Sequence, residues 1–372
     1  MGYLGEDVKK LGFGLMRLPK IGDEFDIEQI KKMVDAFIAA GGTYFDTAFV
    51  YQGSEEAIKK ALVERYPRDS YTLATKNAAW VASSKEEAEK QFNISLERTG
   101  AGYFDFYLLH NIGPTRTEIF ENWDMWSFIK QKKEEGLIRH IGFSFHDGPE
   151  VLEEVINKHP EAEFVQMQIN YADWDDKNIR SRENYEVARR HNLPVIIMEP
   201  VKGGMLANPP KPVVDVFKKA EPDMSPASWA LRFAANLDGL ITVLSGMSTI
   251  EQMEDNLKTM ENFTKFSPEQ EKTVEEALDA MRSIPIIQCT SCNYCAKVCP
   301  MNVGISGIFA CRNHYTLYNN LNAALHRMRF DVERYGKATA SQCIQCGTCE
   351  SVCPQMLPIP ELLAECAEVF GK

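Results

Sequence analysis

The distribution of cysteine is the feature of this sequence that most restricts how the chain folds. All ten cysteines lie between Cys289 and Cys366, and none occurs before them. Eight of them form two runs with the same spacing, C-x-x-C-x-x-C-x-x-x-C-P, which consist of Cys289, Cys292, Cys295 and Cys299, and of Cys343, Cys346, Cys349 and Cys353. This clustering predicts a separate metal-binding region that follows a larger, cysteine-free domain.

The spacing of the two runs favours two [4Fe–4S] clusters. In runs of this type three thiolates bind one cubane, and the fourth cysteine binds the other cluster. On this rule the two ligand sets are Cys289, Cys292, Cys295 and Cys353, and Cys343, Cys346, Cys349 and Cys299. Structural zinc is the alternative for paired C-x-x-C motifs, but four cysteines per run with the same following proline favour iron–sulfur chemistry. Cys311 and Cys366 are expected to be buried thiols.

The segment from about residue 285 to 360 resembles the bacterial-type ferredoxins that hold two [4Fe–4S] clusters. About forty residues of helical character separate the runs, which is similar to the helical ferredoxin variant used as an electron-transfer module in larger redox enzymes. The resemblance implies one-electron transfer, and it makes an electron-transfer protein a candidate partner.

The first two thirds of the chain alternate short apolar runs with longer amphipathic stretches. We expect strands at 11–16, 43–47, 71–76, 104–110, 140–145, 164–170, 194–199 and 240–245. A helix is expected over Asp26–Ala40, with Asp26 as its N-cap and Gly41-Gly42 as its stop. Eight apolar strands that alternate with helices favour a closed (β/α)8 TIM barrel. A doubly wound open sheet is the alternative, but no GxGxxG motif follows a strand.

Two domains are therefore predicted in this α/β protein. Residues 1–268 form the barrel, and residues 269–372 form a smaller, mostly helical, ferredoxin-like domain. The formal net charge of −12 argues against a nucleic-acid partner, because an acidic surface repels phosphates. No apolar run reaches the roughly twenty residues of a membrane span, and no signal peptide is evident, so we expect a cytoplasmic protein without a membrane partner.

Four polar residues stand at or just after predicted strand ends, where the active sites of TIM barrels lie. They are Asp46, Tyr51, Lys76 and His110. Reduction of a carbonyl by hydride needs a proton donor, and a tyrosine hydroxyl is a weak acid unless a nearby cation stabilises its anion. Lys76 supplies that charge in this interpretation, Asp46 orients Lys76, and His110 positions the substrate oxygen.

These residues resemble the Asp/Tyr/Lys/His tetrad of the aldo-keto reductase superfamily. Asp46-Thr47-Ala48-x-x-Tyr51, Lys76 and Leu109-His110 carry the resemblance, which spans about residues 8–260. Further matching segments are Leu11-Gly12-Phe13-Gly14, Gly53-Ser54-Glu55, Ile141-Gly142-Phe143-Ser144 and Ser245-Gly246-Met247-Ser248. The resemblance implies a TIM barrel that exchanges hydride between NAD(P) and a small carbonyl or alcohol substrate.

The resemblance also implies where the nicotinamide cofactor binds. Ser144 and Gln166 should meet the nicotinamide carboxamide, and Gly203 and Gly204 should let the backbone approach the pyrophosphate. The residues expected near the adenosine half are Gly246, Ser248, Gln252 and Asn256. Three positions depart from the family pattern: Phe145 replaces an Asn, Met198 or Glu199 replaces the aromatic residue that stacks on nicotinamide, and Gly246-Met247-Ser248 lacks a basic residue for a 2′-phosphate.

The sequence thus predicts an iron–sulfur oxidoreductase of aldo-keto reductase type, with Tyr51 as general acid. The alternatives are an electron-transfer protein or a redox sensor whose barrel binds a ligand or partner without hydride catalysis. A hydride carries two electrons whereas each cluster passes one, and no flavin motif is present in the sequence to join the two processes. The identity of the substrate and the choice between NAD and NADP stay open.

Overall fold

The computed structural model describes residues 2–113, 116–177 and 179–371, which group into two compact units. The first unit contains the described residues of Met1–Ala207 and Asp223–Glu271, and the second those of Asn208–Pro222 and Lys272–Lys372. The boundary between residues 268 and 269 stays a prediction, because compactness alone does not show which segment folds independently. None of the helices in the described residues is long and apolar enough to cross a membrane.

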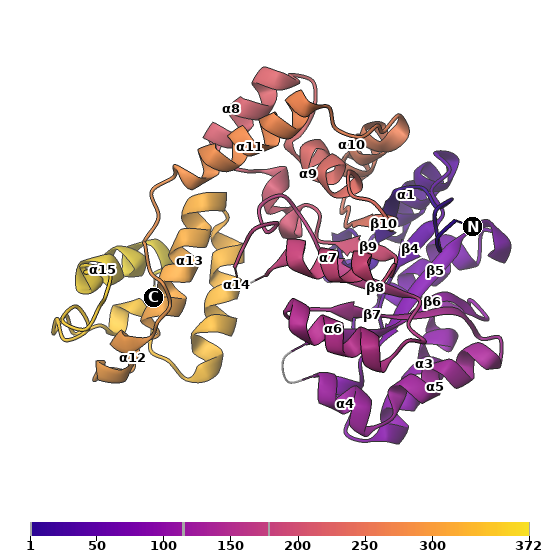
Figure 1. Cartoon of the computed structure of the whole chain (residues 1–372), viewed down its shortest axis with the longest axis horizontal. Helices are drawn as coiled ribbons and strands as arrows, with labels where there is room; N and C mark the ends of the chain where they lie inside the picture. Colours follow the sequence, from indigo (N-terminus) through magenta and orange to yellow (C-terminus); the bar gives the residue numbers. More distant parts are fainter. Residues whose placement is uncertain (1, 114–115, 178, 372) are drawn as a thin grey trace. The chain divides into compact units, whose positions relative to one another are not determined.

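Eight parallel strands close into a barrel in the first unit (Figure 1). They are β1 (Leu11–Gly14), β4 (Tyr44–Asp46), β5 (Thr72–Asn77), β6 (Phe104–Ile112), β7 (Ile138–Phe145), β8 (Phe164–Gln168), β9 (Val195–Met198) and β10 (Leu240–Ser245). Each strand pairs with the next along this series, and β10 pairs with β1 to close the barrel. The eight strands predicted from the sequence are confirmed, with ends that differ by no more than two residues, and the open-sheet alternative is wrong.

The helices of this unit lie around the strands (Figure 1). Their bounds are α1 (Ile27–Ala39), α2 (Ser54–Ile58), α3 (Lys85–Thr99), α4 (Thr117–Asn122), α5 (Met125–Glu134), α6 (Pro149–Lys158), α7 (Ser181–Arg190), α9 (Pro226–Ala235) and α10 (Ile250–Glu261). The N-cap of α1 is confirmed, because Asp26 accepts a hydrogen bond from the Gln29 backbone N–H at 3.0 Å. Two strands of a hairpin, β2 (Lys20–Ile21) and β3 (Glu24–Phe25), precede this helix.

The alternation of side chains along the strands separates an apolar floor from a polar layer inside the barrel. Residues two apart on a strand share a face. On four strands an apolar member of one buried cluster is followed two positions later by a polar residue: Tyr44 and Asp46, Ala74 and Lys76, Leu108 and His110, and Phe164 and Gln166. Leu4 and Val8 pack against this apolar cluster. The polar layer therefore lies toward the carboxyl ends of the strands.

The packing of Phe164 inside the barrel requires a glycine at position 142 on β7. A Cβ at this position would lie 2.4 Å from the Phe164 carbonyl oxygen and 2.7 Å from its ring. No side chain fits there while Phe164 fills the floor, so the β7 contribution to the interior is Ser144, two residues further along.

The second unit is mostly helical. Its helices are α8 (Lys211–Ala220), α12 (Tyr294–Val298), α13 (Ile305–Tyr318), α14 (Leu321–Asp331) and α15 (Ile359–Phe370), while α11 (Pro268–Arg282) begins in the first unit. Helix α13 packs against α14 and α15, and Phe309, Met328 and Leu363 are buried in the shared core. The (β/α)8 barrel followed by a smaller helical region is the architecture predicted from the sequence.

Candidate functional site

A buried ion pair forms the base of the polar layer. Lys76 Nζ donates to Asp46 Oδ1 at 2.5 Å and to the Thr47 carbonyl oxygen at 2.7 Å, and both charged side chains are almost fully buried. Burial raises the pKa of the Asp46 carboxyl and lowers the pKa of Lys76, while the contact between the two opposes both changes. Asp46 Oδ2 has no close hydrogen-bond partner in the described part of the chain, although the nearby Gln166 side chain also lowers the pKa of the Asp46 carboxyl.

Tyr51 lies in the loop after β4, next to the Asp46–Lys76 ion pair. Its turn is closed by hydrogen bonds from the Tyr51 N–H to the Ala48 carbonyl and from the Ser54 N–H to the Tyr51 carbonyl, both 2.9 Å. The Ser54 hydroxyl donates to the Leu15 carbonyl at 2.9 Å and lies 2.8 Å from the Thr47 hydroxyl, which ties the loop to the first strand segment. Lys76 Nζ lies 5.2 Å from the Tyr51 ring centroid.

His110 lies next to Tyr51. The two rings are 5.8 Å apart and nearly perpendicular, at 83°. Trp80 Nε1 donates to the His110 carbonyl at 3.1 Å, and the guanidinium of Arg116 lies 4.1 Å from the Trp80 ring centroid. Burial, followed by the charges of Lys76, His146 and Arg116, lowers the pKa of His110 well below its usual value, so its imidazole is neutral at pH 7.

The pKa of Tyr51 is raised above its ordinary value, and the expectation that Lys76 stabilises the Tyr51 anion stays a prediction. Burial is the main cause, and the negative charges of Asp46 and Glu199 add to it, whereas Arg17 opposes it. The positive charge of Lys76 is largely balanced by Asp46 at 2.5 Å. Tyr51 is therefore a fully protonated donor in the neutral pH range.

The two residues predicted to meet a nicotinamide carboxamide are adjacent in the barrel. Ser144 on β7 pairs with Gln166 on β8, and both are buried. Gln166 Oε1 has no hydrogen-bond partner among the described residues, and the Ser144 hydroxyl oxygen accepts from the Asn111 backbone N–H at 2.7 Å. An unpaired buried amide oxygen is costly unless a ligand satisfies it. This oxygen thus fits the amide N–H of a carboxamide.

The residues predicted to contact the pyrophosphate and the adenosine half of the nicotinamide cofactor lie on two loops. Gly203 (φ 64°) and Gly204 (φ 95°) lie in a turn after β9, and the space where a Gly204 side chain would stand is open. After β10, the Ser248 N–H donates to Gln252 Oε1 at 2.8 Å, and Asn256 Nδ2 donates to the Ser245 hydroxyl at 2.7 Å. Gln252 and Asn256 therefore hold the shape of the loop that contains Gly246 and Ser248.

The sequence named Glu199 only as a departure from the family pattern and did not single out Arg17, and both residues lie at the barrel mouth. Glu199 follows β9 with a positive φ of 55°, and although part of the residue is exposed to solvent, reduced hydration of its carboxyl, followed by the charge of Asp173, raises the pKa of that carboxyl. Arg17, in the short 3-10 helix η1 (Leu15–Arg17) after β1, lies beside both glycine loops. The only signal for Arg17 in the sequence is a basic residue placed directly after the first strand, which on its own points to a solvated surface.

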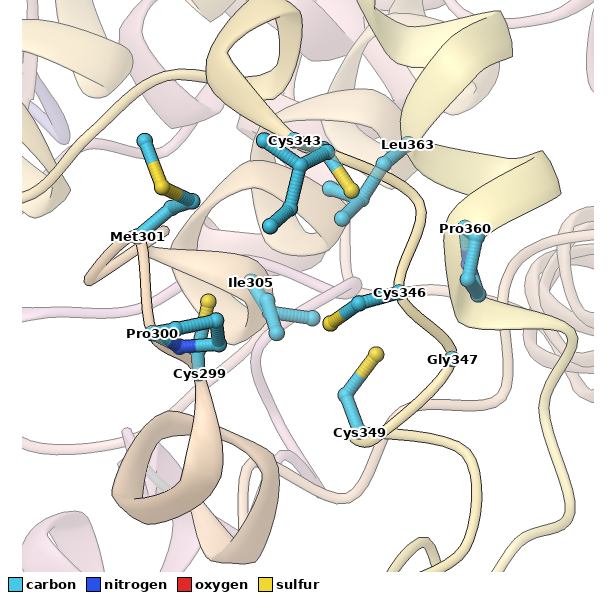
Figure 2. Close-up of a pocket in the computed structure, with 11 residues that line it drawn as sticks. Cys299, Pro300, Met301, Ile305, Cys343, Cys346, Gly347, Cys349, Pro360 and Leu363 are labelled. Carbon is cyan, nitrogen blue, oxygen red and sulfur yellow. The ribbon is translucent and has the colours of Figure 1, made fainter.

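The cysteine runs form two pockets of nearly equal size in the second unit. One pocket, of about 330 Å³ with part of it open to solvent, is lined by Cys289, Cys292, Cys295 and Cys353. The other, of about 310 Å³ and also partly open to solvent, is lined by Cys299, Cys343, Cys346 and Cys349, whose sulfur atoms face a common space in Figure 2. Each set combines three cysteines of one run with the last cysteine of the other. The remaining walls are mostly apolar and include Ile305 in both pockets.

The backbone of the two runs follows the same conformational pattern. Positive φ values recur at equivalent positions: Ser291 and Gln345, Asn293 and Gly347, and Asn302 and Met356. Turns with left-handed residues point successive backbone N–H groups inward, an arrangement typical of anion and iron–sulfur sites. Consistent with this, the Val303 N–H donates to Cys299 Sγ and the Gln345 N–H donates to Cys343 Sγ, both at 3.4 Å.

The other two cysteines are buried away from these pockets. Cys311 on α13 and Cys366 on α15 are inaccessible to solvent, and burial raises the pKa of their thiols to about 11 and about 12. Among the described residues no group of three or more His, Cys, Asp or Glu side chains is close enough to hold a single metal ion.

Two sequence families match the chain. The Aldo/keto reductase family matches residues 10–279, and the 4Fe-4S dicluster domain matches residues 288–357. The uncharacterized oxidoreductase YqkF of Bacillus subtilis (strain 168) is 26% identical over 307 residues, which cover 74% of this chain and 94% of YqkF. Aldo-keto reductase str7 of Strobilurus tenacellus is 29% identical over 213 residues, 54% of this chain and 60% of str7.

Solved structures share the barrel. The holo form of aldo-keto reductase AKR11C1 from Bacillus halodurans superposes with a TM-score of 0.59 at 27% identity, covering 74% of this chain and 95% of AKR11C1. An aldo-keto reductase from Klebsiella pneumoniae in complex with NADPH has a TM-score of 0.57 at 20% identity, covering 72% and 90%, and shows the fold alone. Because the first family spans well over half of the chain, the protein belongs to the aldo/keto reductase family, and it carries a 4Fe-4S dicluster domain C-terminal to its barrel.

Proposed function

We propose that the barrel interconverts a small carbonyl compound and its alcohol by hydride transfer with NAD(P), and that Tyr51 is the general acid. The proposal rests on the contacts that Tyr51 makes with the Asp46–Lys76 ion pair and with His110. The Asp46–Lys76 ion pair of 2.5 Å lies against the Tyr51 ring, and that ring meets the neutral His110 at 5.8 Å. Reduced nicotinamide, when bound, supplies the hydride.

The protein groups handle the proton and the charge. Tyr51 is protonated at neutral pH because its pKa is raised, so it can donate to an oxygen that gains negative charge as hydride reaches the carbonyl carbon. Lys76 then stabilises the charge left on Tyr51, and the neutral His110 orients the substrate oxygen. In the reverse direction Tyr51 accepts the proton of the alcohol. Gln166 and Ser144 fit the carboxamide of the nicotinamide, since Gln166 Oε1 is buried without a partner in the described chain.

We further propose that the eight cysteines of the two runs hold two [4Fe–4S] clusters. The support is the pairing of three cysteines from one run with the fourth from the other around two pockets of similar volume. Each cluster passes one electron, which suits exchange with a separate electron-transfer protein. Cluster assembly predicts about eight iron and eight sulfide ions per chain.

The experiment begins with anaerobic purification, followed by iron and sulfide analysis and titration with NADH and NADPH. Turnover is then measured with a panel of aldehydes and ketones for the wild type, Tyr51→Phe and Tyr71→Phe. Tyr71 is the control, because it is another tyrosine of the barrel and its buried hydroxyl lacks a hydrogen-bond partner in the described chain, so that its removal breaks no hydrogen bond. We expect Tyr51→Phe to lose turnover and Tyr71→Phe to keep it.

Two results would contradict the proposal. Full activity in Tyr51→Phe would show that Tyr51 is not the general acid. Reducible clusters without turnover of any nicotinamide and carbonyl pair would instead favour an electron-transfer or redox-sensing protein whose barrel binds a ligand.

A further inference from the structure

One of the two cysteine pockets has apolar residues at its edge that are exposed to solvent. It is the pocket lined by Cys299 and by three cysteines of the second run (the second-run pocket). Met301 and Ile344 also line it, and they expose 40% and 59% of their surface. None of the described residues around the pocket of Cys289 is a large apolar residue exposed to this degree. Exposed apolar residues that gather at one place mark interaction sites.

A second segment of the chain lies beside this edge and extends it. Asn302, which follows Met301, accepts a hydrogen bond from Lys337 Nζ at 2.7 Å, and its own side-chain amide donates to the Gly336 carbonyl at 3.3 Å. Tyr335, next to this glycine, exposes 69% of its surface. The segment that contains Tyr335 therefore continues the surface that begins at Met301.

The charge of this surface differs from the charge of the whole chain. The formal net charge of −12 arises before the cysteine runs, because the chain from Cys289 onward has seven lysines and arginines and six aspartates and glutamates. Arg334 is exposed, and Lys337 donates to a neutral amide and not to a carboxylate. Glu333 is the only acidic residue between positions 332 and 338. This segment is therefore positively charged.

The acidic residues nearest to the second-run pocket belong to its other side. Figure 2 shows Met301 on one side of the pocket and Gly347 and Pro360 on the opposite side. Glu361 directly follows Pro360, and Glu350 Oε2 lies 3.8 Å from the place of a Gly347 side chain. The side of Met301 thus combines exposed apolar and basic residues, a surface that consists of Met301, Arg334, Tyr335 and Lys337 (the basic rim).

We infer that the basic rim docks an acidic one-electron carrier protein, which exchanges electrons with the cluster of the second-run pocket. This inference rests on the proposed two-cluster function. One electron moves in each encounter, so that the cluster is oxidised as the carrier is reduced, or the reverse. Opposite charges on the two surfaces speed and orient the encounter, and apolar contacts form the centre of such interfaces. Because Met301 lines the pocket itself, a carrier docked on the basic rim lies at the edge of the cluster site.

The test uses the anaerobically purified full-length protein, with its iron and sulfide content measured. Its affinity for an acidic flavodoxin is determined by calorimetry at low and at near-physiological ionic strength, and a basic c-type cytochrome serves as the carrier of opposite charge. Stopped-flow absorbance then follows the transfer of one electron from the dithionite-reduced protein to each carrier.

Two variants change the basic rim without touching the cluster sites. Arg334→Glu reverses one charge and Tyr335→Ser removes one exposed ring, and neither residue lines a cysteine pocket. Two variants of the barrel are the matched controls. Lys60→Glu makes the same change of charge at an exposed residue, and Ile21→Ser removes an apolar side chain from a residue that is 71% exposed.

We expect Arg334→Glu to raise the Kd for flavodoxin roughly 10-fold at low ionic strength, and by less when salt screens the charges. Tyr335→Ser should raise it roughly 5-fold, as for the loss of an aromatic contact in an interface. Electron transfer to flavodoxin should slow in both variants. The two controls should match the wild type, the iron content should be the same in all variants, and the cytochrome should bind the wild type more weakly than flavodoxin does.

Other results would overturn the inference. Among them are a wild type that does not bind flavodoxin, an affinity unchanged by Arg334→Glu and Tyr335→Ser, and an equal loss in Lys60→Glu, which would assign the effect to net charge. Tighter binding or faster reduction of the cytochrome would show that the partner is basic. In each of these cases the two-cluster proposal would stand if the protein holds its iron and sulfide. Protein that lacks both would overturn that proposal and the docking inference together.

Discussion

Lys76→Met should destabilise the barrel because it leaves the Asp46 carboxylate buried without its partner. Both side chains are almost inaccessible to solvent, and the contact that is lost is 2.5 Å long. Removing one partner of a buried ion pair costs about 3–5 kcal/mol, whereas replacing both partners by neutral groups costs much less. The double variant Asp46→Asn/Lys76→Met should therefore be more stable than Lys76→Met alone.

Tryptophan fluorescence during urea unfolding isolates this effect. All five tryptophans, Trp80, Trp123, Trp126, Trp174 and Trp229, belong to the first unit, so the signal reports on the barrel and not on the cluster-binding region. With a urea m-value of about 3 kcal/mol/M, a loss of 3–5 kcal/mol lowers the midpoint by about 1–1.7 M. The free energy of unfolding is compared for the wild type, both single variants and the double variant.

The pH dependence gives a second measurement of the same prediction. Burial raises the pKa of Asp46, and without Lys76 the main opposition to this rise is removed, leaving only the smaller effect of Gln166. A carboxyl whose pKa is raised in the folded state favours folding when it is protonated, so its stabilising contribution is present at low pH and lost as the pH rises through the folded-state pKa. The difference in the free energy of unfolding between the wild type and Lys76→Met should therefore become smaller as the pH is lowered. A deficit below about 1 kcal/mol, or a double variant as unstable as the sum of the single variants, would refute the reasoning.

Three further changes test other parts of the molecule. Cys346→Ala should lower the iron and sulfide content, whereas Cys311→Ala should keep the wild-type content; equal content in both would contradict the ligand assignment. Gly142→Ala should lower stability by about 1–3 kcal/mol or more, since the new Cβ meets the Phe164 carbonyl at 2.4 Å, and an unchanged melting temperature would contradict the packing argument. Burial, followed by the charge of Lys76, lowers the pKa of the buried His110 well below its usual value, so below pH 6.5 unfolded His110 takes up a proton that the folded state refuses. Barrel stability should fall as the pH drops below 6.5, and less so in His110→Gln.

The barrel strands were predictable because strand patterns are local. Each predicted strand is an apolar run of a few residues bounded by polar or turn residues, and all eight occur within two residues of their expected ends. The polar layer was predictable for the same reason: Asp46, Lys76 and His110 each follow an apolar interior residue by two positions. The helix cap at Asp26 depends only on the next three residues.

The direction of the Tyr51 pKa was not predictable from the tetrad alone. The sequence places a lysine near a tyrosine, but burial and the charges of Asp46 and Glu199 depend on how distant strands surround the phenol. The contact between Asp46 and Lys76 was expected from the sequence, but how far Asp46 offsets the effect of Lys76 on the phenol depends on the geometry of the buried pair. The energy of ionisation is a sum over the whole environment and therefore a property of the folded chain.

The sequence by itself determined the barrel, the tetrad candidates and the two cysteine sets, because each depends on spacing within a short segment or on a fixed ligand rule. Only the tertiary structure decided which groups from separate loops meet. Arg17, Gly203 and Gly246 come together because the barrel closes β1 against β10 and places β9 next to β10. No local sequence motif predicts that Arg17 lies at the mouth of the site, because its position there results from closure of the barrel.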